Sequence, residues 1–184
     1  MSSVVISGNT SGTITLDAPA VAGTTTLTLP ATSGTVLTTA STFGGTGPAF
    51  SAYATSTQTI SGGTFTKVTL GLEDFDTNNN FASSTFTPTV AGYYQINCTV
   101  FVEATTITRI IANIYKNGAS LERLVDIGVT GSNSAGVTGS MVVYMNGSTD
   151  YLELYIYATG TGTFNLNGAT DRNCRFNGSM VRGA

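Results

Sequence analysis

Two stretches of this chain show a strict two-residue alternation of apolar and polar positions, and that period predicts β-strands. Along Tyr94–Val102 one face is apolar and is expected to be core; it carries Tyr94, Ile96, Cys98, Val100 and Val102. The other face of that strand carries Gln95, Asn97, Thr99 and Phe101. Along Asp150–Tyr157 the expected core face is Leu152, Leu154 and Ile156, and the outward face holds Tyr151, Tyr155 and Tyr157. Outward aromatic side chains suit a subunit interface, because a Tyr ring is apolar while its hydroxyl stays hydrated.

Similar apolar runs recur from Phe50 to the end of the chain, separated by turn residues, a spacing typical of a β-sandwich. About ten strands are predicted, at 50–55, 64–72, 84–88, 92–103, 108–116, 120–129, 137–145, 150–158, 162–167 and 173–182. Two Asn-Gly pairs, Asn117-Gly118 and Asn146-Gly147, tolerate the positive φ of a type I′ turn, so each predicts a tight hairpin. Helix signals are absent. The fold class predicted is all-β, an antiparallel jelly-roll sandwich with an extended β-rich N-terminal arm.

The N-terminal segment, residues 1–42, contains three short alternating pieces, at Thr13–Leu16, Thr26–Pro30 and Gly34–Thr38. Each piece is too short to close a core within one chain, so the segment is expected to need a partner. That partner is either the same segment of other subunits or the surface of a different protein, the alternative being a floppy tail. The attachment residues predicted are Ile14, Leu16, Leu27, Leu29, Val36 and Leu37. Gly-rich residues 43–48 are interpreted as a linker, and 49–184 as the globular domain.

The amino-acid composition argues against two classes of function, nucleic-acid binding and membrane insertion. Charged residues make up only 9% of the chain, against about 25% in an average soluble domain. Uncharged Thr, Ser, Gly and Asn therefore have to keep it hydrated. Seven scattered Lys and Arg residues and a net charge of -3 give no basic stripe, so nucleic-acid binding is not expected. No apolar run of about 18 residues predicts membrane insertion, and Met1–Gly12 lacks a signal-peptide pattern.

Catalytic chemistry is poorly represented. The chain has no His, which removes His-dependent triads and His metal ligands, and its carboxylates show no paired, buried setting. We therefore expect neither an enzyme nor a cofactor. The acidic cluster Glu73–Asp76, followed by Asn78–Asn80, offers oxygen ligands of the kind Ca²⁺ takes. It lacks the spacing and glycine of an EF-hand loop, so a solvated charged loop is the favoured interpretation and no metal site is predicted.

One stretch of the domain carries a family resemblance. Phe86-Thr87-Pro88-Thr89-Val90-Ala91-Gly92-Tyr93-Tyr94-Gln95-Ile96 resembles the globular head of the C1q and tumour necrosis factor (TNF) family. Ala49–Ala52, Ile114–Gly118 and Phe176–Val181 are similar to the family's first strand, central hairpin and closing strand. The resemblance implies a homotrimer and places the strands of Tyr94–Val102 and Asp150–Tyr157 together in the inner sheet. It thereby makes Phe101, Tyr155 and Tyr157 trimer-contact candidates, the alternative being a solvent-facing sheet.

The same resemblance puts the strand of Cys98 beside that of Cys174. A disulfide between them needs Cβ atoms within about 4.5 Å and a suitable torsion, so reduced buried thiols are favoured over a cross-strand disulfide.

The N-terminal pieces resemble stretches of bacteriophage fibre and virion proteins, on Gly12–Pro19, Thr26–Pro30 and Gly34–Thr38. No collagen-like repeat is present, which argues against a complement role. The two resemblances together imply a virion structural protein: a short trimeric fibre or a capsid decoration at the virion surface. Its expected partners are a capsid or tail protein and a host-surface glycan or protein. The alternatives are a carbohydrate-binding module of a receptor-binding tail fibre and, less favoured, a secreted signalling ligand.

Overall fold

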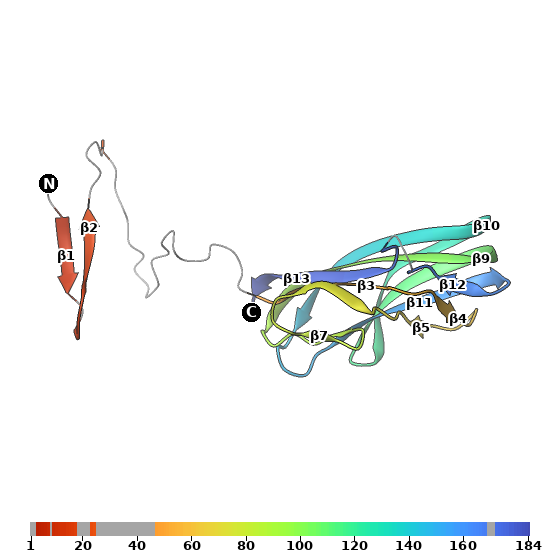
Figure 1. Cartoon of the computed structure of the whole chain (residues 1–184), viewed down its shortest axis with the longest axis horizontal. Helices are drawn as coiled ribbons and strands as arrows, with labels where there is room; N and C mark the ends of the chain where they lie inside the picture. Colours follow the sequence, from red (N-terminus) through yellow and green to blue (C-terminus); the bar gives the residue numbers. More distant parts are fainter. Residues whose placement is uncertain (1–2, 8, 18–22, 25–46, 169–171) are drawn as a thin grey trace. The chain divides into compact units, whose positions relative to one another are not determined.

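The computed structural model describes residues 3–7, 9–17, 23–24, 47–168 and 172–184. The chain divides into two units, Met1–Ser41 and Thr42–Ala184. Every regular element among the described residues is a β-strand (Figure 1). The described part thus has no helix long and apolar enough to cross a membrane.

The N-terminal unit contains a two-stranded antiparallel sheet of β1 (Ser3–Ser7) and β2 (Thr13–Asp17). Five residue pairs join the strands, from Ser3–Asp17 to Ser7–Thr13. The strand predicted at Thr13–Leu16 is confirmed as β2. It contains the attachment candidates Ile14 and Leu16, whose role stays a prediction. Strand β1 was not predicted, because its centre is an unbroken apolar triplet without alternation. The other attachment candidates, Leu27, Leu29, Val36 and Leu37, lie outside the described residues.

We call the second unit the head, and its described residues form eleven strands. They are β3 (Ala49–Tyr53), β4 (Gln58–Ile60), β5 (Thr66–Lys67), β6 (Leu72–Asp76), β7 (Phe81–Ala82), β8 (Thr85–Phe86), β9 (Gly92–Lys116), β10 (Ala119–Met145), β11 (Leu152–Thr161), β12 (Phe164–Leu166) and β13 (Arg175–Gly183). The main path of hydrogen-bonded neighbours runs β6-β3-β13-β9-β11-β8-β7, with β10 beside β9, β5 beside β11, and β12 joining β4 to β9.

Strands β9 and β10 are long enough to take part in both layers of a sandwich, and Figure 1 shows them running along the head. The part of β9 before Glu103 pairs with β13, whereas the part after Thr106 pairs with β11. Register shifts in β10 between Gly128 and Ser134 lie opposite this change of neighbour. We call β6, β3, β13, the first part of β9 and the last part of β10 the first layer. The second layer is β11, β8, β7, β5 and the remaining parts of β9 and β10.

The apolar faces of both layers meet in one core cluster. The core residues predicted from alternation on β9 and β11 are confirmed, because each is at most 1% exposed. Aromatic rings fill the core near β3: the Phe50 ring centroid lies 4.2 Å from that of Phe86, 5.0 Å from that of Phe81 and 5.1 Å from that of Phe176. These contacts join β3 and β13 of the first layer to the short β7 and β8.

The strand predicted at 64–72 does not form as one element. Alternation in this stretch is real, since Val68 and Leu70 are buried, but side chains satisfy two of its backbone N–H groups. Thr69 N–H donates to Gln58 Oε1 over 2.8 Å, and Leu70 N–H donates to Ser84 Oγ over 2.9 Å. Only β5 at its start and β6 at its end pair as strands. The apolar alternation therefore predicted correctly which residues are buried here, but it did not predict which residues pair as strands.

The two predicted hairpins differ. Asn117 and Gly118 both have positive φ, 55° and 79°, and join Lys116 to Ala119, so the tight turn is confirmed. The prediction at Asn146-Gly147 is wrong, because β10 and β11 are not paired with each other. Asn146 Oδ1 instead accepts backbone N–H groups of Ser148, Thr149 and Asp150, which stabilises a longer loop.

The beginning and end of the head lie side by side. Met180 N–H donates to the carbonyl of Pro48 over 3.0 Å, and Ala184 N–H donates to the carbonyl of Ala91 over 3.3 Å. The first described residues of the head therefore lie next to its last strand, β13.

Candidate functional site

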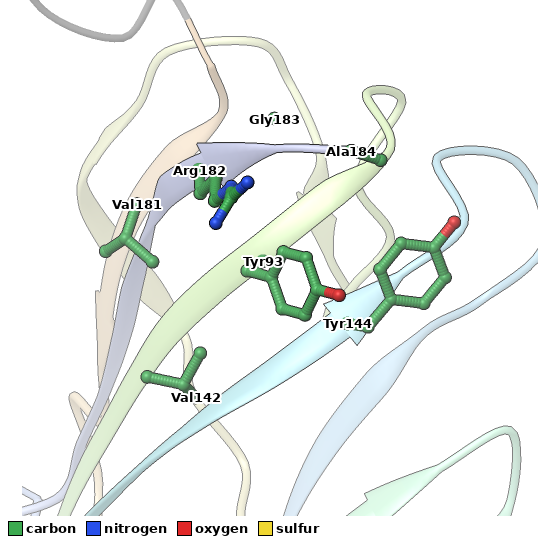
Figure 2. A pocket seen from close by; sticks show the side chains of 7 residues that line it. All are labelled: Tyr93, Val142, Tyr144, Val181, Arg182, Gly183 and Ala184. Atoms are coloured by element: carbon green, nitrogen blue, oxygen red, sulfur yellow. The ribbon is translucent and has the colours of Figure 1, made fainter.

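The outward face of the first layer has an exposed apolar cluster at the end where the head begins and finishes. Tyr93 on β9 pairs in register with Tyr144 on β10, and their ring centroids lie 5.5 Å apart. Val142 on β10 and Val181 on β13 flank them, and the four side chains are 44–57% exposed. We call these four residues the Tyr93 cluster. Together with Arg182 and the C-terminal residues they line an open groove of about 540 Å³ (Figure 2). Exposed apolar side chains gathered in this way are typical of an interaction surface.

Beyond the Tyr93 cluster, the middle of the same face carries uncharged polar side chains, with Arg175 and Arg182 near the two ends of β13. Asn97 Nδ2 donates to Asn177 Oδ1 over 3.0 Å, and Gln95 Nε2 donates to Asn97 Oδ1 over 3.3 Å. The hydroxyls of Thr99 and Thr138 lie 3.3 Å apart on the next pair of strands. Subunit interfaces have cores that are depleted of charge and keep hydrogen-bonding groups satisfied. This face therefore has the composition of an interface core rather than of an ordinary solvated surface.

Charges appear at the β3–β6 side of the face. Asp74 forms ion pairs with Arg172 and with Arg175, and it accepts a hydrogen bond from Ser51. The Arg172 guanidinium also lies 4.3 Å from the centroid of the Tyr53 ring. The carboxylate of Asp74 is consequently committed to protein partners.

The other described carboxylate at the centre of the acidic cluster is also occupied. Asp76 accepts the backbone N–H of Phe81 over 2.7 Å and that of Asn78 over 3.3 Å. These contacts stabilise the turn between β6 and β7. Two of the three carboxylates in the cluster that was considered for Ca²⁺, those of Asp74 and Asp76, therefore have structural partners.

The three predicted trimer-contact residues do not share one face. Phe101 lies on the first layer, opposite Gly136, on the same outward face as the Tyr93 cluster. Tyr155 and Tyr157 lie on β11, opposite Asn113 and Ile111, and face outward from the second layer. The assumption that both strands belong to one sheet is therefore wrong, since β9 changes layer between Glu103 and Thr106. A trimer contact remains a prediction for each residue. Of the three, only Phe101 lies on the face that would contact a threefold axis along the first layer.

Sequence reasoning missed the Tyr93 cluster, although part of its signal was present. Tyr93 has the same parity as Gln95, Asn97, Thr99 and Phe101, so extending the alternation by one position would have placed it outward. Val142 and Tyr144 were hidden, because Met141–Met145 is apolar at every position and its alternation is invisible.

The outward face of the second layer carries a different aromatic group. The rings of Tyr115 and Tyr155 are stacked with centroids 3.9 Å apart, and Phe65 lies 5.2 Å from Tyr157 and 6.1 Å from Tyr115. All four are half-buried. Burial, and then the negative charge of Glu153, raises the pKa of the Tyr155 hydroxyl. We call Phe65, Tyr115, Tyr155 and Tyr157 the aromatic platform.

The cysteines are separate thiols buried in the core. Cys98 pairs in register with Phe176 on β13, and Cys174 immediately precedes that adjacent strand. Both cysteines are free, and Cys174 Sγ donates to the carbonyl of Asn167 over 3.4 Å. Burial raises the pKa of the Cys98 thiol to about 11 and raises that of Cys174 as well. The favoured interpretation of two reduced thiols is confirmed.

No protein-family model matches the chain, and no curated protein matches it. Solved structures do share its fold. The globular domain of zebrafish complement 1qA protein gives a TM-score of 0.56 at 20% identity, covering 74% of this chain and 99% of that one. Murine APRIL at pH 8.0 gives 0.55 at 8% identity, covering 73% and 98%. Eiger TNF from S. frugiperda gives 0.56 at 8% identity, covering 75% and 95%.

These identities are low, so the comparisons establish the fold alone. The prediction of an all-β, C1q/TNF-like jelly roll is confirmed.

Proposed function

We propose that this chain is a non-enzymatic virion structural protein whose head forms a homotrimer and whose N-terminal segment attaches to a capsid or tail protein. The observation that carries the proposal is the exposed Tyr93 cluster on the same face as the hydrogen-bonded Asn97–Asn177 pair. A monomer would leave this apolar surface in water. Association would bury this surface, which is favourable by roughly 25 cal/mol for each Å² of apolar area removed from water.

Closure into a ring also has support in the strand order. Strand β10 pairs only with β9 among the described strands, so its other edge is unpaired. A contact between the face of one subunit and a different surface of the next is heterologous, and such contacts form a ring when the rotation between subunits closes. The number three comes from the resemblance to C1q and TNF heads. Phe101 and the Tyr93 cluster are the contacts proposed.

The attachment role rests on the N-terminal unit. A two-stranded hairpin is marginally stable alone, so β1 and β2 gain from a partner surface. Val5 and Ile6 on β1 are 55% and 54% exposed. The resemblance of this segment to phage fibre proteins is what selects a virion partner, with Ile14, Leu16, Leu27, Leu29, Val36 and Leu37 as the proposed attachment residues.

The experiment that tests the proposal has two parts. Light scattering after size exclusion measures the mass of the full chain, and three chains are expected. Purified virions that lack the protein are then mixed with the full chain or with residues 47–184. Retention of the full chain alone is expected. A monomeric head, or equal retention of both proteins, contradicts the corresponding half of the proposal.

A further inference from the structure

The aromatic platform on the second layer covers a buried polar atom that has no partner. Asn113 on β9 is 1% exposed, and it lies directly opposite Tyr155 in the strand register. Its Nδ2 donates to Ser120 Oγ over 2.8 Å, whereas its Oδ1 has no hydrogen-bond partner. Among the described residues this is the single buried side-chain polar atom in that state. An unsatisfied buried acceptor is destabilising, so a hydroxyl donor brought by a ligand would be favoured.

The charge next to the platform is internally neutralised. Lys67 Nζ lies 2.7 Å from Glu153 Oε1 and also donates to Thr85 Oγ1 over 2.7 Å. Lys67 is paired in register with Tyr155, so this ion pair borders the rings. Neither charge is left free for an ionic ligand. A ligand that fits here is neutral, has an apolar surface for the rings and carries hydroxyl groups.

We propose that the aromatic platform is a binding site for a neutral saccharide, with one sugar hydroxyl donating to Asn113 Oδ1. A pyranose ring presents C–H groups on its face, and aromatic faces attract such positively polarised hydrogens. Tyr hydroxyls at the platform add donors and acceptors for the remaining sugar hydroxyls. Asn113 Oδ1 is buried in the free protein, so the proposed contact requires the side chains around it to move aside when the sugar binds. This proposal gives a chemical class to the host-surface partner expected from the sequence, and it rests on the proposed virion role.

The location of the platform is compatible with a trimer. It lies on the layer opposite the Tyr93 cluster, so a trimer built on the first layer leaves it outward. The three platforms of one trimer would bind a repeated glycan together, because the second and third contacts occur at high effective concentration.

The test starts with the full-length protein on an array of neutral oligosaccharides of glucose, galactose, mannose and N-acetylhexosamines. The best trisaccharide is then titrated by calorimetry and by intrinsic tyrosine fluorescence, which reports Tyr directly because the chain has no Trp. Binding with a change in tyrosine emission is expected. Absence of binding to every neutral oligosaccharide, or binding confined to acidic ones, overturns the proposal.

Matched variants locate the site. Tyr155→Ala and Tyr157→Ala are each expected to weaken binding about 3- to 10-fold, the range that loss of an aromatic contact gives. Tyr157→Phe keeps the ring and should bind within about twofold of the wild type by the same arithmetic. Asn113→Leu removes the acceptor at similar volume and is expected to weaken binding about 5-fold, whereas a purely structural role would leave affinity unchanged. Thermal unfolding checks that each variant is folded.

The control is Tyr93→Ser on the first layer, which should disturb subunit association but leave the calorimetric affinity per chain unchanged. Affinity that survives both platform substitutions to Ala in folded protein overturns the saccharide site. A monomer that binds through the platform would refute the trimer alone, and a trimer that binds no neutral saccharide would refute this inference alone.

Discussion

The ring of Tyr93 lies 5.5 Å from the ring of Tyr144 across the register pair that joins β9 to β10. Both side chains are 44% exposed, so each ring covers only part of the other. Two aromatic side chains held against each other by adjacent strands form a rigid surface that loses little conformational entropy on association.

The first prediction concerns that pair. Tyr144→Ser is expected to weaken each subunit contact by roughly 2 kcal/mol, because a central aromatic residue is removed from the proposed interface. Light scattering over a range of concentrations should show trimers dissociating at higher protein concentration than in the wild type. Tyr157→Ser on the second layer is the matched control and should leave the mass unchanged. An effect of equal size from both substitutions would contradict the proposed interface.

Alternation along single strands predicted the core well, because burial on one face of a strand is recorded directly in every second residue. It could not predict which strands share a layer. Phe101 and Tyr155 each face outward from their own strand, yet they lie on opposite layers because β9 changes neighbours between Glu103 and Thr106. Strand pairing depends on contacts between distant parts of the chain, and the alternation within one strand does not indicate which strand lies beside it.

The candidate sites show the same limit. Tyr155 and Tyr157 were identified as outward, but their neighbour Phe65 comes from a separate segment that reaches β11 only in the folded chain. The orphan oxygen of Asn113 was not predictable either, since satisfaction of a polar group depends on which side chains surround it. The sequence therefore located Tyr155 and Tyr157 as outward-facing aromatics and left their grouping to the tertiary structure.

The second prediction concerns the thiols. A pKa of about 11 for Cys98 keeps it protonated at pH 8, and the pKa of buried Cys174 is raised in the same direction. A thiol reagent such as Ellman's should therefore react negligibly with the native protein. In denaturant without reductant it should detect two thiols per chain, matching the two cysteines of the sequence. Detection of none would indicate a disulfide and contradict the free thiols.

The third prediction concerns acid stability at Asp150. Its carboxylate accepts hydrogen bonds from Asn117 Nδ2 and the Asn146 backbone N–H, and lies 2.8 Å from Lys116 Nζ. The Asn117 hydrogen bond, followed by that of Lys116, lowers the pKa of Asp150. The unfolded chain therefore binds a proton at a higher pH than the folded one, and this stabilisation is lost as the pH falls below about 4.

Asp150→Asn should accordingly lower the thermal midpoint at pH 7, because an amide NH₂ would face donors, while the two proteins converge as the pH approaches about 2. Melting curves across this range measure the difference. A constant difference at every pH would assign the effect of the substitution to packing instead.

The last prediction concerns Gly160, at the register shift between β11 and β9. Its φ is +147°, a conformation that L side chains rarely adopt, and an added Cβ would lie 1.9 Å from the carbonyl oxygen of Thr106. Because that oxygen belongs to the backbone of β9, relief requires moving the strand at the point where it changes layer. Gly160→Ala is therefore expected to destabilise the head by more than about 2 kcal/mol. Chemical denaturation of the purified variant measures the loss.

Gly63→Ala is the matched control for this position. Gly63 also has a positive φ, +74°, but an added Cβ meets nothing within 4 Å. Gly63→Ala should therefore destabilise the head only by backbone strain of about 1 kcal/mol. Equal losses at the two glycines would mean that strain alone is responsible. A much larger loss at Gly160 would show that the close approach of β11 to Thr106 is required where β9 passes from one layer to the other.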